Sequence, residues 1–264
     1  MWSSLRISAR YVDNITFDSV ALGCFALARK HESEGDALPP GGGEMPVPPA
    51  TLRSWLPLLK HCAVLYNAPP TSALLAEGLG IGASNVVSYE PMSVTLCPAH
   101  YIALNPSDST VDIVIRGTTV IHDVVADVVG HCEPFFGGHA HAGMLHAAQF
   151  ILSRELTRLQ AICQARPGWT VHAYGHSLGG GIAALIACTL KSSAGVLESL
   201  GSPPVIATTF GAPPVMSEDL ARGCSGYITS VVHAHDMVAK MSCHHLRQLA
   251  NEMEACKEEK PTPH

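Results

Sequence analysis

The chain has 264 residues, of which 47% are hydrophobic and only 14% are charged. This length and composition are typical of a globular protein with one sizeable core, or of one domain with a further attachment. The formal net charge is −6 and the sequence has no long basic run, so nucleic-acid binding has no electrostatic support.

The first 66 residues differ in composition from the rest. Residues 31–50 are dominated by proline and glycine, which is typical of a flexible linker. Residues 51–66 carry apolar side chains at helical spacing despite Pro57. We therefore predict a helical N-terminal extension over residues 1–66 that packs on a main domain over residues 67–264.

Strands and helices alternate along the main domain. Two short apolar runs joined by a polar turn predict a strand pair, and apolar residues at helical spacing predict helices. The alternation predicts an α/β fold, with a mostly parallel sheet covered by helices on both faces. The predicted strands are 101–104, 111–115, 170–174, 205–210 and 227–232, and the predicted helices are 121–129, 142–165, 178–190, 217–222 and 243–259.

Two further features bear on compartment. The longest apolar runs do not predict a membrane span, because residues 20–28 are too few and residues 169–190 contain four glycines and two histidines. The nine cysteines include no C-x-x-C pair, and the N-terminal residues do not resemble a secretory signal. We expect reduced thiols and an intracellular chain, either cytoplasmic or peripheral to a membrane.

One short motif carries chemistry. Gly175-His176-Ser177-Leu178-Gly179 fits G-x-S-x-G, with a predicted strand before it and an apolar helix after it. A nucleophilic serine needs a tight turn between a strand and a helix, and the residues two before and two after it pass too close together for side chains. The motif predicts Ser177 as a nucleophile of an α/β-hydrolase, with the Leu178 N–H as an oxyanion donor.

Further motifs give a family resemblance over roughly residues 85–250. Besides the serine turn, they are Ile115-Arg-Gly-Thr-Thr, His141-Ala-Gly-Met, Phe210-Gly-Ala-Pro-Pro and Val232-His-Ala-His-Asp-Met-Val, in this order. Together they resemble the class 3 (fungal-type) lipases, and within that family the sn-1-specific diacylglycerol-lipase branch. The resemblance implies the α/β-hydrolase fold and hydrolysis of acylglycerol esters without a cofactor.

The resemblance also implies residue roles. Thr118, in Arg-Gly-Thr, matches the family's first oxyanion residue, and Asp236 matches the acid of the catalytic triad. Asp236 follows a predicted strand directly, which is where open α/β sheets carry functional groups. A loop-capping role for Asp236 and a helix-capping role for Thr118 stay open as alternatives.

The triad's histidine is not evident. In the family it lies well downstream of the acid, whereas here only His244, His245 and His264 follow Asp236. Either the sheet is incomplete at the C-terminus and the histidine is missing, or His244, His245, His264, His233 or His235 supplies the base from an unusual position. Without a base, a serine is a very weak nucleophile.

Two functions follow. The first is a serine-dependent hydrolase acting on acylglycerols or other lipid esters, with a membrane or lipid-droplet surface as the expected place of action. The alternative is a catalytically impaired or truncated hydrolase fold that binds lipid or a protein partner.

We expect no metal site, because the His139/His141 and His233/His235 pairs lack further ligands at metal spacing. Residues 130–141, with Phe135 and Phe136, form either a mobile apolar flap over the site or an ordinary loop.

Overall fold

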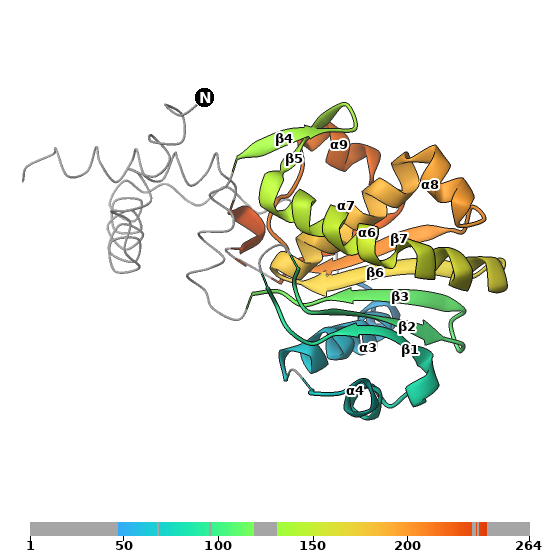
Figure 1. Ribbon diagram of the computed structural model, residues 1–264. Coiled ribbons are helices and arrows are strands. Elements are labelled where there is room, and N and C mark those ends of the chain that lie inside the picture. The colour runs from blue at the N-terminus through green and yellow to red at the C-terminus, as the bar shows by residue number, and fades with distance from the viewer. Residues whose placement is uncertain are drawn as a thin grey trace, which may run out of the picture. The chain divides into compact units, whose positions relative to one another are not determined.

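The structure is a computed structural model that describes residues 47–67, 69–94, 97–118, 131–233, 236 and 238–241 (Figure 1). The chain divides into two compact units, Ala50–Cys243 and a second unit made of Met1–Pro49 and His244–His264. The second unit lies almost wholly outside the described residues. The predicted helices 121–129 and 243–259 and residues 31–46 of the predicted linker 31–50 also lie outside them, so these remain predictions, as does the division of the chain after residue 66. Pro49 and Ala50, at the end of the predicted linker, are helical instead.

A six-stranded sheet forms the centre of the larger unit. Its order is β1-β2-β3-β6-β7-β8. The first three strands pair antiparallel, whereas β3, β6, β7 and β8 are parallel neighbours. This confirms the predicted α/β fold with a mostly parallel sheet. The strands are β1 (Val86–Glu90), β2 (His100–Asn105), β3 (Thr110–Ile115), β6 (Thr170–His176), β7 (Val205–Phe210) and β8 (Ile228–Val231).

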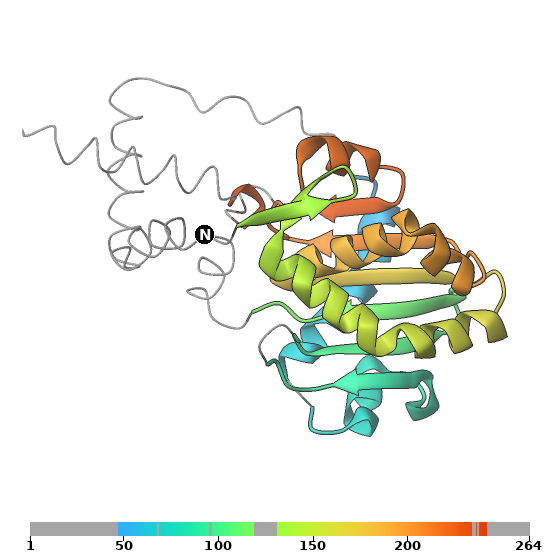
Figure 2. The same cartoon turned by 45° about the horizontal axis from the view of Figure 1, so that its top comes forward.

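Helices cover both faces of the sheet (Figures 1 and 2). The helices α6 (Ala142–Ala165) and α7 (Leu178–Ser192) lie on one face, with the short α8 (Ala194–Ser199) and α9 (Glu218–Gly223). The other face carries α3 (Pro49–Tyr66) and α4 (Ser72–Leu79). Two single turns, η1 (Ala83–Asn85) and η2 (Val238–Lys240), are 3₁₀ helices.

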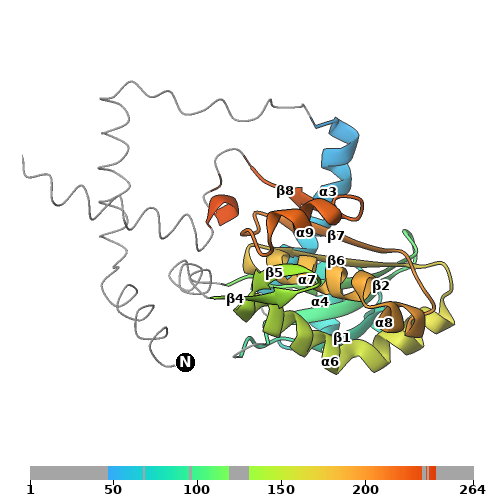
Figure 3. The same cartoon turned by 90° about the horizontal axis from the view of Figure 1, so that it is seen from above.

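The core beneath α3 and α4 explains why residues 49–66 are helical. Leu58, Cys62 and Leu65 recur at a spacing of three or four and pack against a cluster that includes Tyr174 and Phe210 of the sheet. Pro57 lies inside the helix on its exposed side, where water can satisfy the carbonyl that the missing N–H leaves free. The predicted helix is confirmed, and Figure 3 shows it beside β8.

The ordinary loop expected as one alternative for residues 130–141 is wrong for residues 132–141, whereas a flap over the site stays a prediction. Residues 132–141 form an antiparallel hairpin, β4 (Cys132–Phe135) and β5 (Gly138–His141), with Phe136 and Gly137 at positive φ in its turn. Backbone hydrogen bonds from His141 N to Val215 O and from Ser217 N to His139 O fix the hairpin to the segment before α9. Sequence reasoning missed it because Pro134 and two adjacent glycines weaken the strand pattern.

The remaining predicted elements of the described region are confirmed to within a few residues, while β1, α4 and α8 were not predicted. No described helix has both the length and the apolar character that crossing a membrane requires.

Candidate active site

The nucleophile turn has the geometry that its motif predicts. Ser177 sits between β6 and α7 with φ +56° and ψ −130°, a conformation that side chains rarely adopt. Its N–H donates to the Phe210 carbonyl at 2.8 Å, and its own carbonyl accepts from the N–H of Gly180 at 2.9 Å. Neighbouring strand and helix thus hold the serine in a strained conformation, which is common at functional sites.

The two motif glycines are required by close backbone approach. A Cβ on Gly175 would lie 2.5 Å from the backbone of Gly179 and 2.7 Å from the Ile115 carbonyl oxygen. A Cβ on Gly179 would collide with the same Ile115 oxygen and lie 2.7 Å from the Arg116 carbonyl carbon. Because all of these neighbours are backbone atoms, they cannot move aside as a flexible side chain could. The turn can be closed only with glycine at both positions.

The predicted oxyanion residues lie on two sides of the serine. Leu178 is the first residue of α7, where backbone N–H groups have no partner within the helix. Thr118 follows Gly117, which lies very close to the nucleophile turn. A Cβ on Gly117 would be 3.1 Å from the Ser177 Cβ and 2.5 Å from the His176 carbonyl oxygen. The segment after β3 therefore passes directly against the nucleophile turn, and Thr118 is one residue from that contact.

Asp236 lies after β8, at the same end of the sheet. Its Oδ1 accepts from the Val238 N–H at 2.9 Å, and its own N–H donates to the His233 carbonyl at 3.0 Å. A Cβ on Gly211, which has φ +55°, would lie 2.6 Å from Asp236 Oδ2 and 4.0 Å from His176 Nε2. Gly211 therefore leaves room for the carboxylate, and the acid faces the ring of the residue that precedes the nucleophile. The capping role left open for Asp236 is present as well, through Val238.

His176 and Tyr66 are neighbours of the site that sequence reasoning did not assign. His176 is an exposed residue, and its Nδ1 is 2.9 Å from the Tyr66 hydroxyl. Burial by surrounding atoms lowers the pKa of His176, and the negative charge of Asp236 opposes that shift. Tyr66, His176 and Asp236 thus form a polar row on the α3 side of the nucleophile.

The catalytic base is not found among the described histidines. His233 is exposed and contributes its backbone carbonyl to Asp236, while His235, His244, His245 and His264 lie outside the described residues. His141 caps α6, with its Nδ1 accepting from the Met144 N–H at 3.4 Å. Within the described ranges, no three side chains are grouped as a metal site would need.

An apolar cavity of about 260 Å³ lies beside the first turns of α7. Gly181, whose N–H donates to the Ser177 carbonyl at 3.3 Å, lines one side of it, and Ala239 of η2 lines another. Between them stand the segment 212–216, α9 and β8, with lining residues Pro213, Val215, Ile228 and Val232 among them. The cavity therefore extends from the nucleophile helix toward the segment that follows Asp236.

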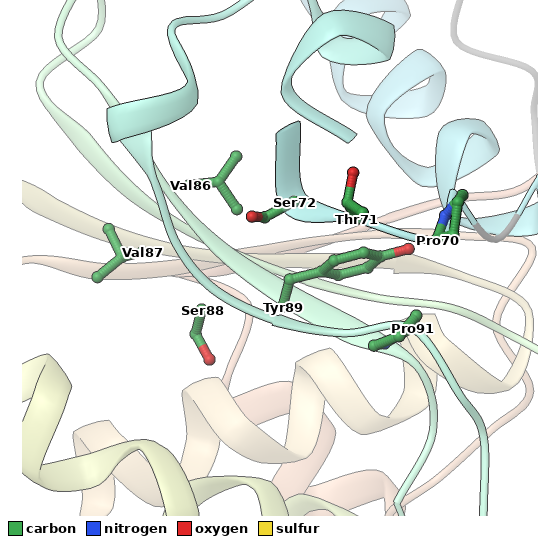
Figure 4. A pocket seen from close by; sticks show the side chains of 8 residues that line it. All are labelled: Pro70, Thr71, Ser72, Val86, Val87, Ser88, Tyr89 and Pro91. Atoms are coloured by element: carbon green, nitrogen blue, oxygen red, sulfur yellow. The ribbon is translucent and has the colours of Figure 1, made fainter. Parts of the chain in front are cut away.

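A second pocket of about 280 Å³ is unrelated to the serine (Figure 4). It lies at the start of α4 and along β1, the antiparallel edge of the sheet. Its polar groups serve the fold, because Thr71 caps α4 by accepting from the Leu74 N–H and the Tyr89 hydroxyl donates to the Pro69 carbonyl. None of the residues assigned to the candidate active site lines this pocket.

The chain is similar to lipases in sequence. Residues 112–245 match the family described as "Lipase (class 3)". Human diacylglycerol lipase-alpha is 30% identical over 155 residues, which are 53% of this chain and 14% of that protein. Secreted mono- and diacylglycerol lipase 2 of Gibberella zeae is 30% identical over 186 residues, 65% of this chain and 43% of that protein. The chain thus spans less than half of either relative.

Solved structures show the same fold. The native Rhizomucor miehei lipase propeptide complex superimposes with a TM-score of 0.61 at 18% identity, covering 80% of this chain and 74% of that one. A triacylglycerol lipase whose catalytic centre is formed by a serine protease triad superimposes with a TM-score of 0.60 at 18% identity, covering 76% and 77%. These likenesses confirm the α/β-hydrolase fold. With more than half of its residues matched by the family, the chain belongs to the class 3 lipases.

Proposed function

We propose that this protein hydrolyses carboxylic esters of acylglycerols through an acyl-enzyme. The Ser177 oxygen attacks the ester carbonyl carbon, and its proton passes through a histidine to the departing glyceride oxygen as the ester bond breaks. Water then attacks the acyl-enzyme, which releases the fatty acid and returns the proton to Ser177. The reaction needs no cofactor.

The other residues have roles set by charge. The negative oxygen that develops during attack accepts hydrogen bonds from the Leu178 N–H and from Thr118. Asp236 orients the histidine and stabilises its protonated form. The candidates for this histidine are His233, His235, His244, His245 and His264, of which only His233 is among the described residues.

The observation that carries the proposal is the strained serine between two glycines. A serine at φ +56° costs on the order of 1–3 kcal/mol, and a fold that needed only a strand-to-helix turn would place glycine there. Placing a hydroxyl at that position makes sense when the hydroxyl reacts.

Acylglycerols are proposed as substrates for two reasons. The matched relatives carry the names of diacylglycerol and monoacylglycerol lipases. The apolar cavity beside α7 offers a non-aqueous path for part of an acyl chain close to Ser177. We also propose that the protein meets these substrates at a membrane or lipid-droplet surface inside the cell, which imaging of the fluorescently labelled chain would test.

The first test is labelling of the purified chain with a fluorophosphonate, read by intact mass beside Ser177→Ala. We expect one adduct on the wild-type chain and none on the variant, because only an activated serine is phosphonylated. Hydrolysis of a diacylglycerol in detergent micelles, followed by fatty-acid release, then tests the substrate.

A folded wild-type chain that takes no adduct would overturn the proposal and favour the impaired hydrolase fold that only binds lipid. An adduct that persists in Ser177→Ala would show that another residue is the nucleophile. Labelling without fatty-acid release, while a small water-soluble ester is hydrolysed, would keep the serine chemistry and reject acylglycerols.

A further inference from the structure

The helix α3 exposes a row of leucines. The exposed fractions are 48% for Leu52, 61% for Leu56 and 41% for Leu59. Residues at a spacing of i, i+4 and i+7 lie on one side of a helix, so these three form a continuous apolar row. The row is separate from the core-facing side, because that side consists of Trp55, Leu58, Cys62 and Leu65.

Basic residues accompany this row. Arg53 and Lys60 are exposed and are also seven residues apart, so they share a side that adjoins the leucines. The 18-residue helix contains no aspartate or glutamate, although the whole chain has a net charge of −6. Neither cation forms an ion pair with any residue that the structure describes. The exposed surface of α3 is therefore apolar and positive.

The helix α6 shows that this pattern is not general in the molecule. It also covers the sheet with one side, but its exposed side carries Ser153, Arg154 and Arg158. Arg154 pairs with Glu90 at 3.3 Å, and Arg158 pairs with Glu155. Its single large exposed apolar side chain is Phe150. An ordinary water-facing helix of this chain is thus polar and ion-paired.

The leucine row also has a defined relation to the serine. The helix ends at Tyr66, whose hydroxyl contacts the ring of His176, the neighbour of Ser177. An 18-residue helix is about 27 Å long. A surface bound along α3 therefore lies within one helix length of the nucleophile.

We infer that the Leu52–Leu56–Leu59 row, with Arg53 and Lys60 beside it, docks this protein on an anionic lipid surface. Leucines enter the boundary of the acyl chains while the cations meet anionic headgroups, the pattern of helices that lie in a membrane interface. Such a surface carries the substrates of the proposed lipid-ester hydrolysis, so the biological role of docking rests on the proposed function. Docking itself needs no catalysis. The cations of α3 and its lack of any acid complement the anionic headgroups of such a surface.

The test is co-sedimentation of the full chain with vesicles of equal parts phosphatidylcholine and phosphatidylserine. We expect the wild type to bind and the triple variant Leu52→Ser, Leu56→Ser, Leu59→Ser to lose at least about tenfold in partition coefficient. Replacing Arg53 and Lys60 by glutamine should weaken binding about fivefold per charge and remove most of its salt dependence. The matched controls are Phe150→Ser on α6 and Leu74→Ser on α4, which are also exposed and should bind like the wild type.

Three results would overturn the inference. They are a wild type that does not bind, a triple variant that binds as well as the wild type, and equal losses in the two controls. Thermal unfolding of each variant checks that it is folded.

Fluorophosphonate labelling in solution separates this inference from the proposed function. The triple variant should be labelled as fast as the wild type, since no leucine of the row lies at the serine. Vesicle binding that depends on α3 in a chain that takes no label would retain the docking surface and reject the hydrolase.

Discussion

The two faces of the sheet hold the site in different ways. On the α7 face, Gly175 and Gly179 bring backbone into contact with backbone, and no side chain is needed to set the geometry. On the α3 face, side chains with hydroxyl, imidazole and carboxyl groups form hydrogen bonds inside the core. The nucleophile is thus positioned by close packing, which does not respond to pH, whereas the groups around it on the other face can gain or lose protons.

The buried polar groups of the α3 face form two sets. The Tyr174 hydroxyl donates to Asp112 Oδ2 at 3.1 Å, so His61 Nδ1, 2.9 Å from the same hydroxyl, must be the donor in its own contact. His172 Nε2 and the Thr208 hydroxyl are 3.0 Å apart. Burial raises the pKa of Asp112 to about 6, even though Thr110 and Tyr174 donate to its carboxylate, and lowers the pKa of His172 to about 4.

The largest effect that we expect comes from the acid at the serine. Asp236→Asn should lower kcat about 10⁴-fold, because an amide favours the wrong histidine tautomer and does not stabilise the imidazolium. Ester hydrolysis at saturating substrate measures it, with the exposed Asp219→Asn on α9 as the matched control. A variant that retained more than a tenth of the wild-type rate would show that Asp236 is not the triad acid.

On the α7 face, Gly179→Ala should lower the free energy of unfolding by about 3 kcal/mol or more. The added methyl group meets backbone atoms of Ile115 and Arg116, which no rotamer change can relieve. Urea unfolding measures the loss. The control is Gly195→Ala in α8, where a Cβ meets nothing within 4 Å and helix propensity predicts a gain of about 0.5–1 kcal/mol. Equal stabilities of the two variants would contradict the packing argument.

On the α3 face, Asp112→Asn should change how stability depends on pH. The pKa of Asp112 is about 6 in the folded chain against 3.8 for a fully hydrated aspartate, so between these values the folded state binds more protons than the unfolded state. Asp112 therefore makes stability fall as pH rises from about 4 to about 6, by about 3 kcal/mol. Asparagine does not titrate, so the free energy of unfolding of Asp112→Asn, relative to that of the wild type, should increase by the same amount as the pH rises over this range.

Urea unfolding at a series of pH values checks this prediction. His172, with its pKa lowered by burial, acts in the opposite sense, since its neutral folded form makes stability rise with pH between about 4 and 6.5. His172→Gln should therefore shift the profile in the other direction from Asp112→Asn. Parallel profiles for the wild type and Asp112→Asn would mean that the carboxyl keeps its ordinary pKa.

The smallest effect should come from Tyr66→Phe, which removes one hydrogen bond to His176. We expect kcat/KM to fall about fivefold, corresponding to about 1 kcal/mol, and the apparent pKa in its pH profile to shift, because His176 faces Asp236. Tyr89→Phe, which removes a hydroxyl bonded to Pro69 away from the serine, is the control. A lowered rate with an unchanged pH profile would mean that Tyr66 acts only through folding.

A feature of this site is easier to predict from the sequence when the residues that cause it lie close together along the chain. The turn at Ser177 is local, since five consecutive residues and their two flanking elements define it, and the structure has the predicted geometry. Asp236 was assigned from the family resemblance, and its place directly after a predicted strand supports the assignment, because parallel strands bring their carboxyl ends to one edge. The alternation of elements likewise predicts the mostly parallel sheet, in which β3, β6, β7 and β8 are parallel neighbours.

Tyr66 could not be found in that way. It is 110 residues from His176 in the chain, and their contact depends on how α3 packs across the sheet. The β4–β5 hairpin was missed because its stability comes from hydrogen bonds to residues 215–217, and its own sequence contains a proline and glycines. The sequence predicts a feature well when its cause is local or topological, and poorly when the cause is a side-chain contact between distant segments.

The conformation of Ser177 has an evolutionary consequence. At φ +56° the backbone would be more relaxed with glycine, so the serine persists only while selection for its hydroxyl outweighs the strain. Members of this lineage that lose the chemistry are therefore expected to acquire glycine at position 177 before other residues of the turn change. Relatives that do not react with a fluorophosphonate should therefore carry a glycine codon at the position of Ser177, which sequencing of their genes would check.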